Sequence, residues 1–211
     1  MAPIPSQRPA YRVGLFLVLL AALMQGACSP LGVGISATTA TGVVIAQERS
    51  AGDAVDDAGI NLQISEALFR AHIDDLYRKV NVDVMEARVL LTGQVKTQQL
   101  VDQAALIAWK VDGVATVINE VRVGELDALE IVRDRWISMR LRVRMLGDTE
   151  IYDVNYTIVT VGGSIYLLGI GQSQDELEQV LAHARDMPYV RRVVAHVVMK
   201  DDPSRSAAAT E

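Results

Sequence analysis

The stretch "VLLTGQVKTQQLVDQAALIAWKVDGVATVINEVRV", Val89 to Val123, decides the fold. It aligns over its whole length, without a gap, with "IYLLGIGQSQDELEQVLAHARDMPYVRRVVAHVVM", Ile165 to Met199. The alignment places Gly93 over Gly169, an offset of 76 residues. Self-similarity at a fixed offset indicates a repeated structural unit. We therefore expect two copies of one small domain.

Each copy predicts a strand ending in Gly, then a helix, then a second strand. The helix of the first copy follows Thr97, which can cap it alone, and that of the second opens with Ser173 and Glu176, a capping box. An earlier strand precedes each copy, at 80–84 ("VNVDV") and 154–161 ("VNYTIVTV"). Short turns in "MEAR" and "GGS" predict that each earlier strand pairs with the next as a hairpin.

A further helix is predicted ahead of each hairpin, because apolar residues recur there at i, i+4 and i+8. These residues are Ile60, Ile64 and Leu68 in the first copy, and Ile137, Leu141 and Met145 in the second. A small three-stranded sheet is stable only when helices cover it. We therefore predict an α+β fold of two tandem αββαβ domains, each a three-stranded mixed sheet covered by two helices.

The two units resemble BON domains. The motifs that carry the resemblance are "RSAGDAVDD" (Arg49–Asp57), "VLLTG" (Val89–Gly93), "VDGVATVINEVRVGE" (Val111–Glu125) and "DRWISMRLRVRML" (Asp134–Leu146). Together they are similar to the dual-BON outer-membrane lipoproteins of Gram-negative bacteria, the DolP (YraP-like) group. We expect BON domain 1 at 48–125, BON domain 2 at 126–200 and a disordered tail at 201–211. Ala87 stands where the family's first hairpin usually has Gly, which predicts a different turn type there.

Residues 1–27 have the features of a secretory signal peptide. Arg8 and Arg12 form a positive segment, and the apolar run Val13–Met24 that follows is too short to span a bilayer. The mature protein is therefore expected in the periplasm. The alternative is an uncleaved membrane anchor.

Cys28 is the only cysteine and follows the apolar run closely. It predicts the lipid-modified N-terminus of a bacterial lipoprotein, because two or more acyl chains give stable anchoring. Ser29 follows instead of Asp, which favours the periplasmic face of the outer membrane. Residues 28–47 are then the lipidated N-terminus and a flexible tether. Ordinary signal cleavage, after Ala27 or in "SATTA", would instead give a soluble periplasmic protein.

Composition limits the partners. Without Arg8 and Arg12, 18 basic residues remain against 26 acidic ones, so the mature chain is near −8. Nucleic acid is excluded as a partner, because phosphate backbones need a net basic surface. The three histidines, His72, His183 and His196, have no Cys or carboxylate at metal-ligand spacing, so no metal site is expected.

The sequence carries no catalytic constellation. No Ser/His/Asp or Cys/His arrangement stands out, and nothing indicates a cofactor. The acidic run "DAVDD", Asp53 to Asp57, is interpreted as capping and dipole partners of a helix N-terminus. We therefore expect a protein that is not an enzyme.

The segment "RDRWISMRLRVRML", Arg133 to Leu146, carries the strongest functional signal. On a helix of about 100° per residue, its apolar side chains form two groups. One group is the core stripe, and the other is a flank of Val132, Trp136, Met139 and Val143. Arg133, Arg140 and Arg144 form a ridge between the two. Because the first copy keeps only the core stripe, with Gly59 in the place of Trp136, we predict that the fold does not need the ridge and the flank.

This pattern favours binding to an anionic membrane, such as one containing phosphatidylglycerol or cardiolipin. Arginines bind lipid phosphates, and a Trp ring lies at headgroup level. The predicted lipid-binding residues are Arg133, Trp136, Arg140, Val143 and Arg144. The family resemblance also implies phospholipid binding through this helix and a role in envelope integrity.

Two alternatives to membrane binding remain. The flank can pack against the first domain, with the arginines pairing Asp74 and Asp75. It can also dock on another protein, so that the chain is an interaction or assembly module for envelope or cell-wall enzymes, whose exposed sheet edges accept a partner strand.

Overall fold

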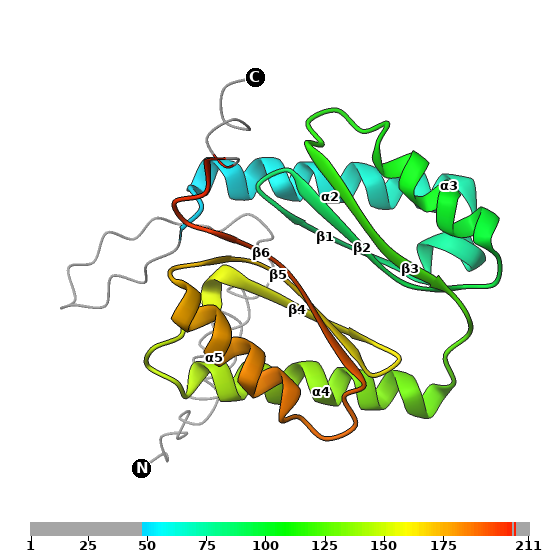
Figure 1. The fold of residues 1–211 in the computed structure, drawn as a ribbon. Coiled ribbons are helices and arrows are strands. Elements are labelled where there is room, and N and C mark those ends of the chain that lie inside the picture. Colours follow the sequence, from blue (N-terminus) through cyan, green and yellow to red (C-terminus); the bar gives the residue numbers. More distant parts are fainter. Residues whose placement is uncertain (1–47, 204, 206–211) are drawn as a thin grey trace, which may run out of the picture. The chain divides into compact units, whose positions relative to one another are not determined.

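The structure is a computed structural model that describes residues 48–203 and 205 (Figure 1). The predicted signal peptide, Cys28 and the tether lie outside the described residues. Within the described part, no helix combines the length and the apolar character needed to cross a membrane. The described residues all belong to one compact unit, which falls within residues 44–211. A fragment of these residues therefore contains the complete cores of both domains.

Each repeat folds as αββαβ, so the predicted fold class is confirmed. The first domain contains α2 (Ala51–Ala71), the short π-helical turn η2 (Ile73–Tyr77), β1 (Val80–Met85), β2 (Arg88–Val95), α3 (Gln98–Ala108) and β3 (Thr116–Val123). The second contains α4 (Ala128–Leu146), the 3-10 turn η3 (Asp153–Asn155), β4 (Tyr156–Val161), β5 (Ser164–Gly171), α5 (Gln174–Arg185) and β6 (Arg192–Met199). In each mixed sheet the central strand is antiparallel to the first strand and parallel to the third.

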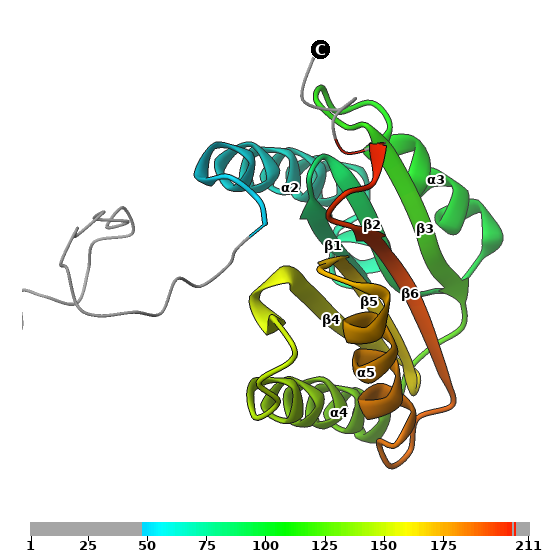
Figure 2. The same ribbon diagram turned by 60° about the vertical axis from the view of Figure 1, so that its left-hand side comes forward.

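Helices cover one face of each sheet, and the two sheets face each other (Figures 1 and 2). The predicted core stripes are confirmed, because all six residues are buried between helix and sheet. Each such side chain contributes about 1.5–3 kcal/mol by leaving water. A third apolar cluster joins the sheets and contains Met85, Leu90, Val161, Tyr166, Leu168 and Ile170. The two domains therefore share a core.

Polar contacts fix the alignment of the two sheets. The Arg88 guanidinium donates to the carbonyl oxygens of Gly169 (3.0 Å) and His196 (3.2 Å). The His196 ring lies 3.1 Å from a carboxylate oxygen of Glu120 on the other domain. His183 contacts Asp148 at 2.8 Å within the second domain. Both histidines therefore have structural partners.

The first hairpin corrects the prediction of a different turn at Ala87. Glu86 and Ala87 have φ of +51° and +57°, close to the +56° and +72° of Gly162 and Gly163 in the second hairpin. Both turns are thus two-residue turns with left-handed backbone, the geometry that matches strand twist. In the first copy, residues other than Gly adopt this conformation.

The side chain of Asp57 explains how Ala87 tolerates this conformation. Its carboxylate accepts hydrogen bonds from the backbone N–H groups of Glu86 and Ala87, both at 2.9 Å. Asp134, at an offset of 77, does the same for Gly162 and Gly163 at 2.7 and 2.8 Å. The interpretation of Asp57 as a helix cap was therefore wrong. It lies in the second turn of α2 and holds the hairpin turn instead.

Helix caps also differ in part from the prediction. Asp53 does form a capping box, with Ser50 as the N-cap of α2. Ser173 caps α5, but the Glu176 side chain does not accept a hydrogen bond from the backbone N–H of Ser173. The Glu176 carboxylate instead accepts from the backbone N–H groups of Tyr152 and Gln172. The predicted capping box is thus only half formed, because Glu176 is buried and satisfies a neighbouring loop.

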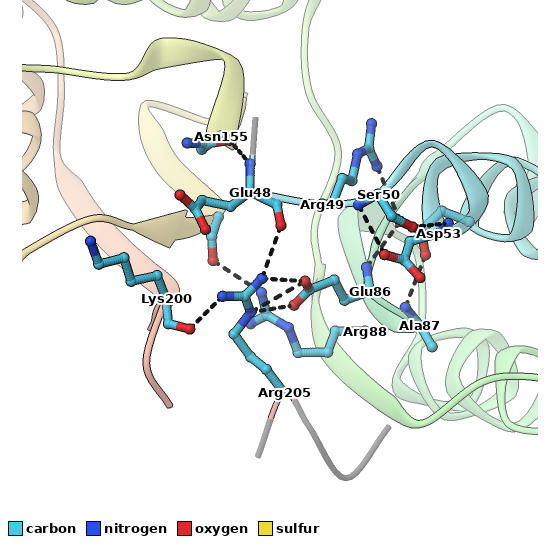
Figure 3. Close-up of polar contacts among 12 residues, drawn as sticks. Glu48, Arg49, Ser50, Asp53, Glu86, Ala87, Arg88, Asn155, Lys200 and Arg205 are labelled. Carbon is cyan, nitrogen blue, oxygen red and sulfur yellow. Dashed lines mark hydrogen bonds and ion pairs between the residues drawn. The ribbon is translucent and has the colours of Figure 1, made fainter. Parts of the chain in front are cut away.

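Arg205 ties the C-terminal segment to the first domain (Figure 3). Its guanidinium lies 2.7 Å from the carboxylate of Glu86 and also donates to the carbonyl oxygens of Glu48 and Lys200. Both partners of the ion pair are mostly buried. This part of the predicted tail therefore lies against the first hairpin turn.

Candidate functional site

Helix α4 carries the surface that the sequence singled out. Asp127 and Glu130 form a capping box at its start, and Leu, Met and Arg favour the helix that follows. Its inner face is the buried stripe. Its outer face is a line of apolar side chains, each 62–63% exposed, which we call the α4 strip: Leu129, Val132, Met139, Val143 and Leu146. Contiguous exposed apolar surface marks an interaction site.

Arginines border the α4 strip on both sides. Arg140 lies on one side, as predicted, and is exposed. Arg135 and Arg142 are also exposed and lie on the opposite side, about 180–200° around the helix from Arg133. These two arginines were not among the predicted lipid-binding residues, although the same helical projection places them there. The surface is therefore an apolar strip between two cationic borders.

Aromatic rings hold two of the predicted arginines. The Cζ atom of Arg140 lies 5.4 Å from the Trp136 ring centroid, and that of Arg133 lies 5.0 Å from the Tyr189 centroid. Trp136 is half-buried against the core of the second domain, and its ring meets that of Tyr189 edge to face at 6.3 Å. Cation–π contacts leave the edge of a guanidinium available for hydrogen bonds to an anion.

Tyr189, in the loop between α5 and β6, was missed by the sequence analysis. It is 64% exposed and has a φ of +69°, a conformation that costs a bulky residue energy. The repeat alignment pairs it with Gly113, whose φ is +86°. A Tyr that aligns with a Gly of the other repeat is the signal that could have identified it. Strained backbone conformations cluster at functional sites.

The remaining predicted residues have different surroundings. Val143 lies in the α4 strip and is exposed. Arg144 is half-buried and forms a 2.7 Å ion pair with the exposed Asp186. Exposed pairs of this kind contribute at most about 1 kcal/mol, so an external anion can compete for Arg144.

The alternative of inter-domain packing through this flank is wrong. Asp74 pairs with Arg78, and Asp75 pairs with Lys96, all within the first domain. Val132 and Val143 remain exposed. The domains instead pack through their sheets.

The first domain corrects a second prediction, that only the core stripe survives there. Val55, Leu62 and Phe69 are 70%, 69% and 48% exposed and form a line along α2, which we call the α2 strip. At an offset of 77 they align with Val132, Met139 and Leu146 of the α4 strip. Part of the flank is therefore common to both copies. The arginine borders and Trp136 occur only in the second.

Among residues 48–203 and 205, no group of three or more His, Cys, Asp or Glu side chains could hold a metal ion. The site offers binding chemistry, because it combines exposed apolar area with guanidinium groups at its margins.

Fold and surface together define a tandem α+β protein that presents an arginine-bordered amphipathic helix. The BON domain profile matches residues 56–125 and 133–201. The chain therefore belongs to the BON domain family.

Several relatives align with most of this chain. A protein of Anaplasma centrale, "Uncharacterized protein in gshII 5'region", is 37% identical over 72% of this chain and 99% of its own length. The "21 kDa hemolysin" of Actinobacillus pleuropneumoniae is 28% identical over 71% and 78%. "Outer membrane lipoprotein DolP" of Haemophilus influenzae is 27% identical over 76% and 83%.

Proposed function

We propose that this protein is a non-enzymatic, lipid-anchored periplasmic module that binds anionic phospholipid through α4 and supports envelope integrity. The observation that carries the proposal is the α4 strip with arginines along both margins. An apolar strip enters the headgroup region while flanking arginines reach lipid phosphates. Each basic residue near an anionic surface contributes about 1 kcal/mol, so a few of them overcome the acidic charge of the whole chain.

The anchor and the location are part of the same proposal. Cys28 would be acylated and would hold the protein at the periplasmic face of the outer membrane. The Haemophilus influenzae relative is named as an outer membrane lipoprotein, which supports this placement. Intact mass of the membrane-extracted protein tests it, because an unmodified thiol at Cys28 would remove the anchor.

The membrane test replaces α4 residues by their counterparts from the first copy. Arg140→Gln and Val143→Glu introduce the residues that α2 carries at Gln63 and Glu66, so the fold should tolerate both. Cosedimentation of residues 44–211 with phosphatidylglycerol or cardiolipin vesicles is the measurement. The double variant should bind about tenfold more weakly or worse.

Trp136→Ala should also weaken vesicle binding, with Trp109→Ala as the matched control. Trp109 is 53% exposed on the first domain, away from α4. Binding should decrease with added salt and be weak on neutral phosphatidylcholine vesicles. Unchanged binding in the double variant, with its fold intact by circular dichroism, would refute membrane contact through α4.

A second function, docking on a protein, is favoured by the α2 strip. Its neighbours on α2 include Asp56 and Glu66 instead of arginines, so an anionic membrane would repel it. An interaction module for envelope or cell-wall proteins fits this surface. Leu62→Glu should abolish a salt-insensitive, lipid-independent complex that crosslinking detects in cells. A complex that survives this substitution would place the docking surface elsewhere.

A further inference from the structure

A cavity lies behind the Arg135 border of α4, between the two domains. Its volume is about 610 Å³, within the range of small-ligand sites. Arg78 and Lys79, between η2 and β1, line one side, and Arg135 and Arg142 on α4 line the other. Four basic residues, two from each domain, thus line one space.

These charges are mostly unneutralised. Among the described residues, Asp134 is the only acidic one that lines the cavity, and both of its carboxylate oxygens already accept from the second hairpin turn. Arg78 pairs with Asp74 at 3.2 Å, but both side chains are about two-thirds exposed or more. Lys79, Arg135 and Arg142 have no ion-pair partner within the part of the chain that the structure describes. Converging like charges repel one another, so an anion that joins them is favoured.

The chemistry of the lining indicates which anion. Guanidinium groups bind phosphate oxygens in pairs, and lysine adds a compact positive charge. Ile131, Met139 and Ile158 also line the space, so the apolar part of a ligand has surface to contact there. We propose that this inter-domain cavity binds the phosphate group of a phosphate ester.

Two sources of that phosphate fit. Arg135 and Arg142 belong both to the cavity and to the border of the α4 strip. A phospholipid whose chains contact the strip can therefore place its phosphate in the cavity, and this source rests on the proposed function. A water-soluble phosphate ester is the other source, and it needs no membrane.

The first test uses sodium glycerol 1-phosphate and residues 44–211 at constant ionic strength. Amide chemical shifts of Lys79, Ser138 and Arg142 should change saturably. Arg78→Gln together with Lys79→Gln should weaken this response about tenfold or more, because two of four cationic groups are lost. The matched control, Arg70→Gln with Lys110→Gln, removes two exposed charges of the same domain that do not line the cavity.

The second test measures phosphatidylglycerol vesicle binding for the same variants and for Trp136→Ala. If the lipid is the source, the cavity variant should bind vesicles about tenfold more weakly than the control, whereas Trp136→Ala should leave the glycerol phosphate response unchanged. If glycerol phosphate binds but vesicles do not, the cavity proposal stands with a soluble ligand, and the proposed membrane function fails.

The cavity proposal itself would be overturned by equal behaviour of the cavity variant and its control in both tests. The cavity proposal would also be overturned if amide chemical shifts changed evenly at all exposed basic residues, because such changes indicate nonspecific screening. If, in that case, Trp136→Ala still weakened vesicle binding, the proposed membrane function would stand and the cavity would have no part in it.

Discussion

Replacing Asp83 by asparagine should stabilise the protein at neutral pH and much less in acid. Asp83 lies on β1 opposite Leu90, with its side chain on the face that packs toward the other sheet. It is largely buried, and its carboxylate has no hydrogen-bond partner within the described residues. Burial without a partner raises the pKa of Asp83 from 3.8 to about 6.

The size of the effect follows from this pKa. The difference between a pKa of 3.8 and one of about 6 corresponds to about 3 kcal/mol between the protonated and charged forms. Because the side chain keeps some solvent contact, we expect about 2 kcal/mol. The folded pKa is above the unfolded value, so the folded state binds the proton more tightly. The contribution of Asp83 to stability is therefore present below about pH 4 and is lost as the pH rises through about 6.

Urea unfolding of residues 44–211 and of Asp83→Asn at about pH 4.5 and about pH 8 measures this contribution. The variant should be about 2 kcal/mol more stable at the higher pH, and most of this gain should disappear at the lower one. Asp112→Asn is the matched control, because Asp112 is exposed. Comparison between variants cancels the titration of the other carboxylates. A gain of equal size at both pH values would refute the argument.

Four further predictions concern the hairpin turns and the loop between α5 and β6. Ala87→Gly should stabilise the protein by about 0.5–1 kcal/mol in urea unfolding, because its left-handed φ costs an L residue energy. Gly163→Ala should destabilise it instead, since a Cβ atom there would lie 2.9 Å from the Tyr189 carbonyl oxygen. Asp57→Asn should cost about 2–4 kcal/mol in the same assay, because two backbone N–H groups lose a charged acceptor. Tyr189→Gly should leave the melting temperature within a few degrees, because the loss of ring contacts offsets the relief of backbone strain. The same substitution should reduce binding to phosphatidylglycerol vesicles. A large loss of stability would show that Tyr189 serves only the fold.

Periodicity allowed much of the fold to be predicted. The stripes Ile60–Leu68 and Ile137–Met145 were identifiable because one face of a helix repeats every 3.6 residues. The Trp136 flank and the Arg140 border were found in the same way, and comparison of the two copies separated them from the core. The same helical projection also places Arg135 and Arg142 beside the flank, but they were not among the predicted lipid-binding residues.

Other features depend on contacts between residues far apart in the chain. Asp57 acts on a turn about 30 residues later, and the same residue types predict a helix cap when only neighbours are considered. Tyr189 meets Trp136 only because α5 and β6 fold back over α4. Local pattern does not specify such pairs.

Local spacing and repetition are enough to predict the two αββαβ units, their buried stripes and an amphipathic helix in the second copy. Three features follow only from the packing of the two domains: the sheets share a core, Asp83 is half-buried on the face toward the other sheet, and Arg78 and Lys79 line one cavity with Arg135 and Arg142. The reason is physical: burial and charge density depend on which surfaces meet, and that is set by the packing of the two domains.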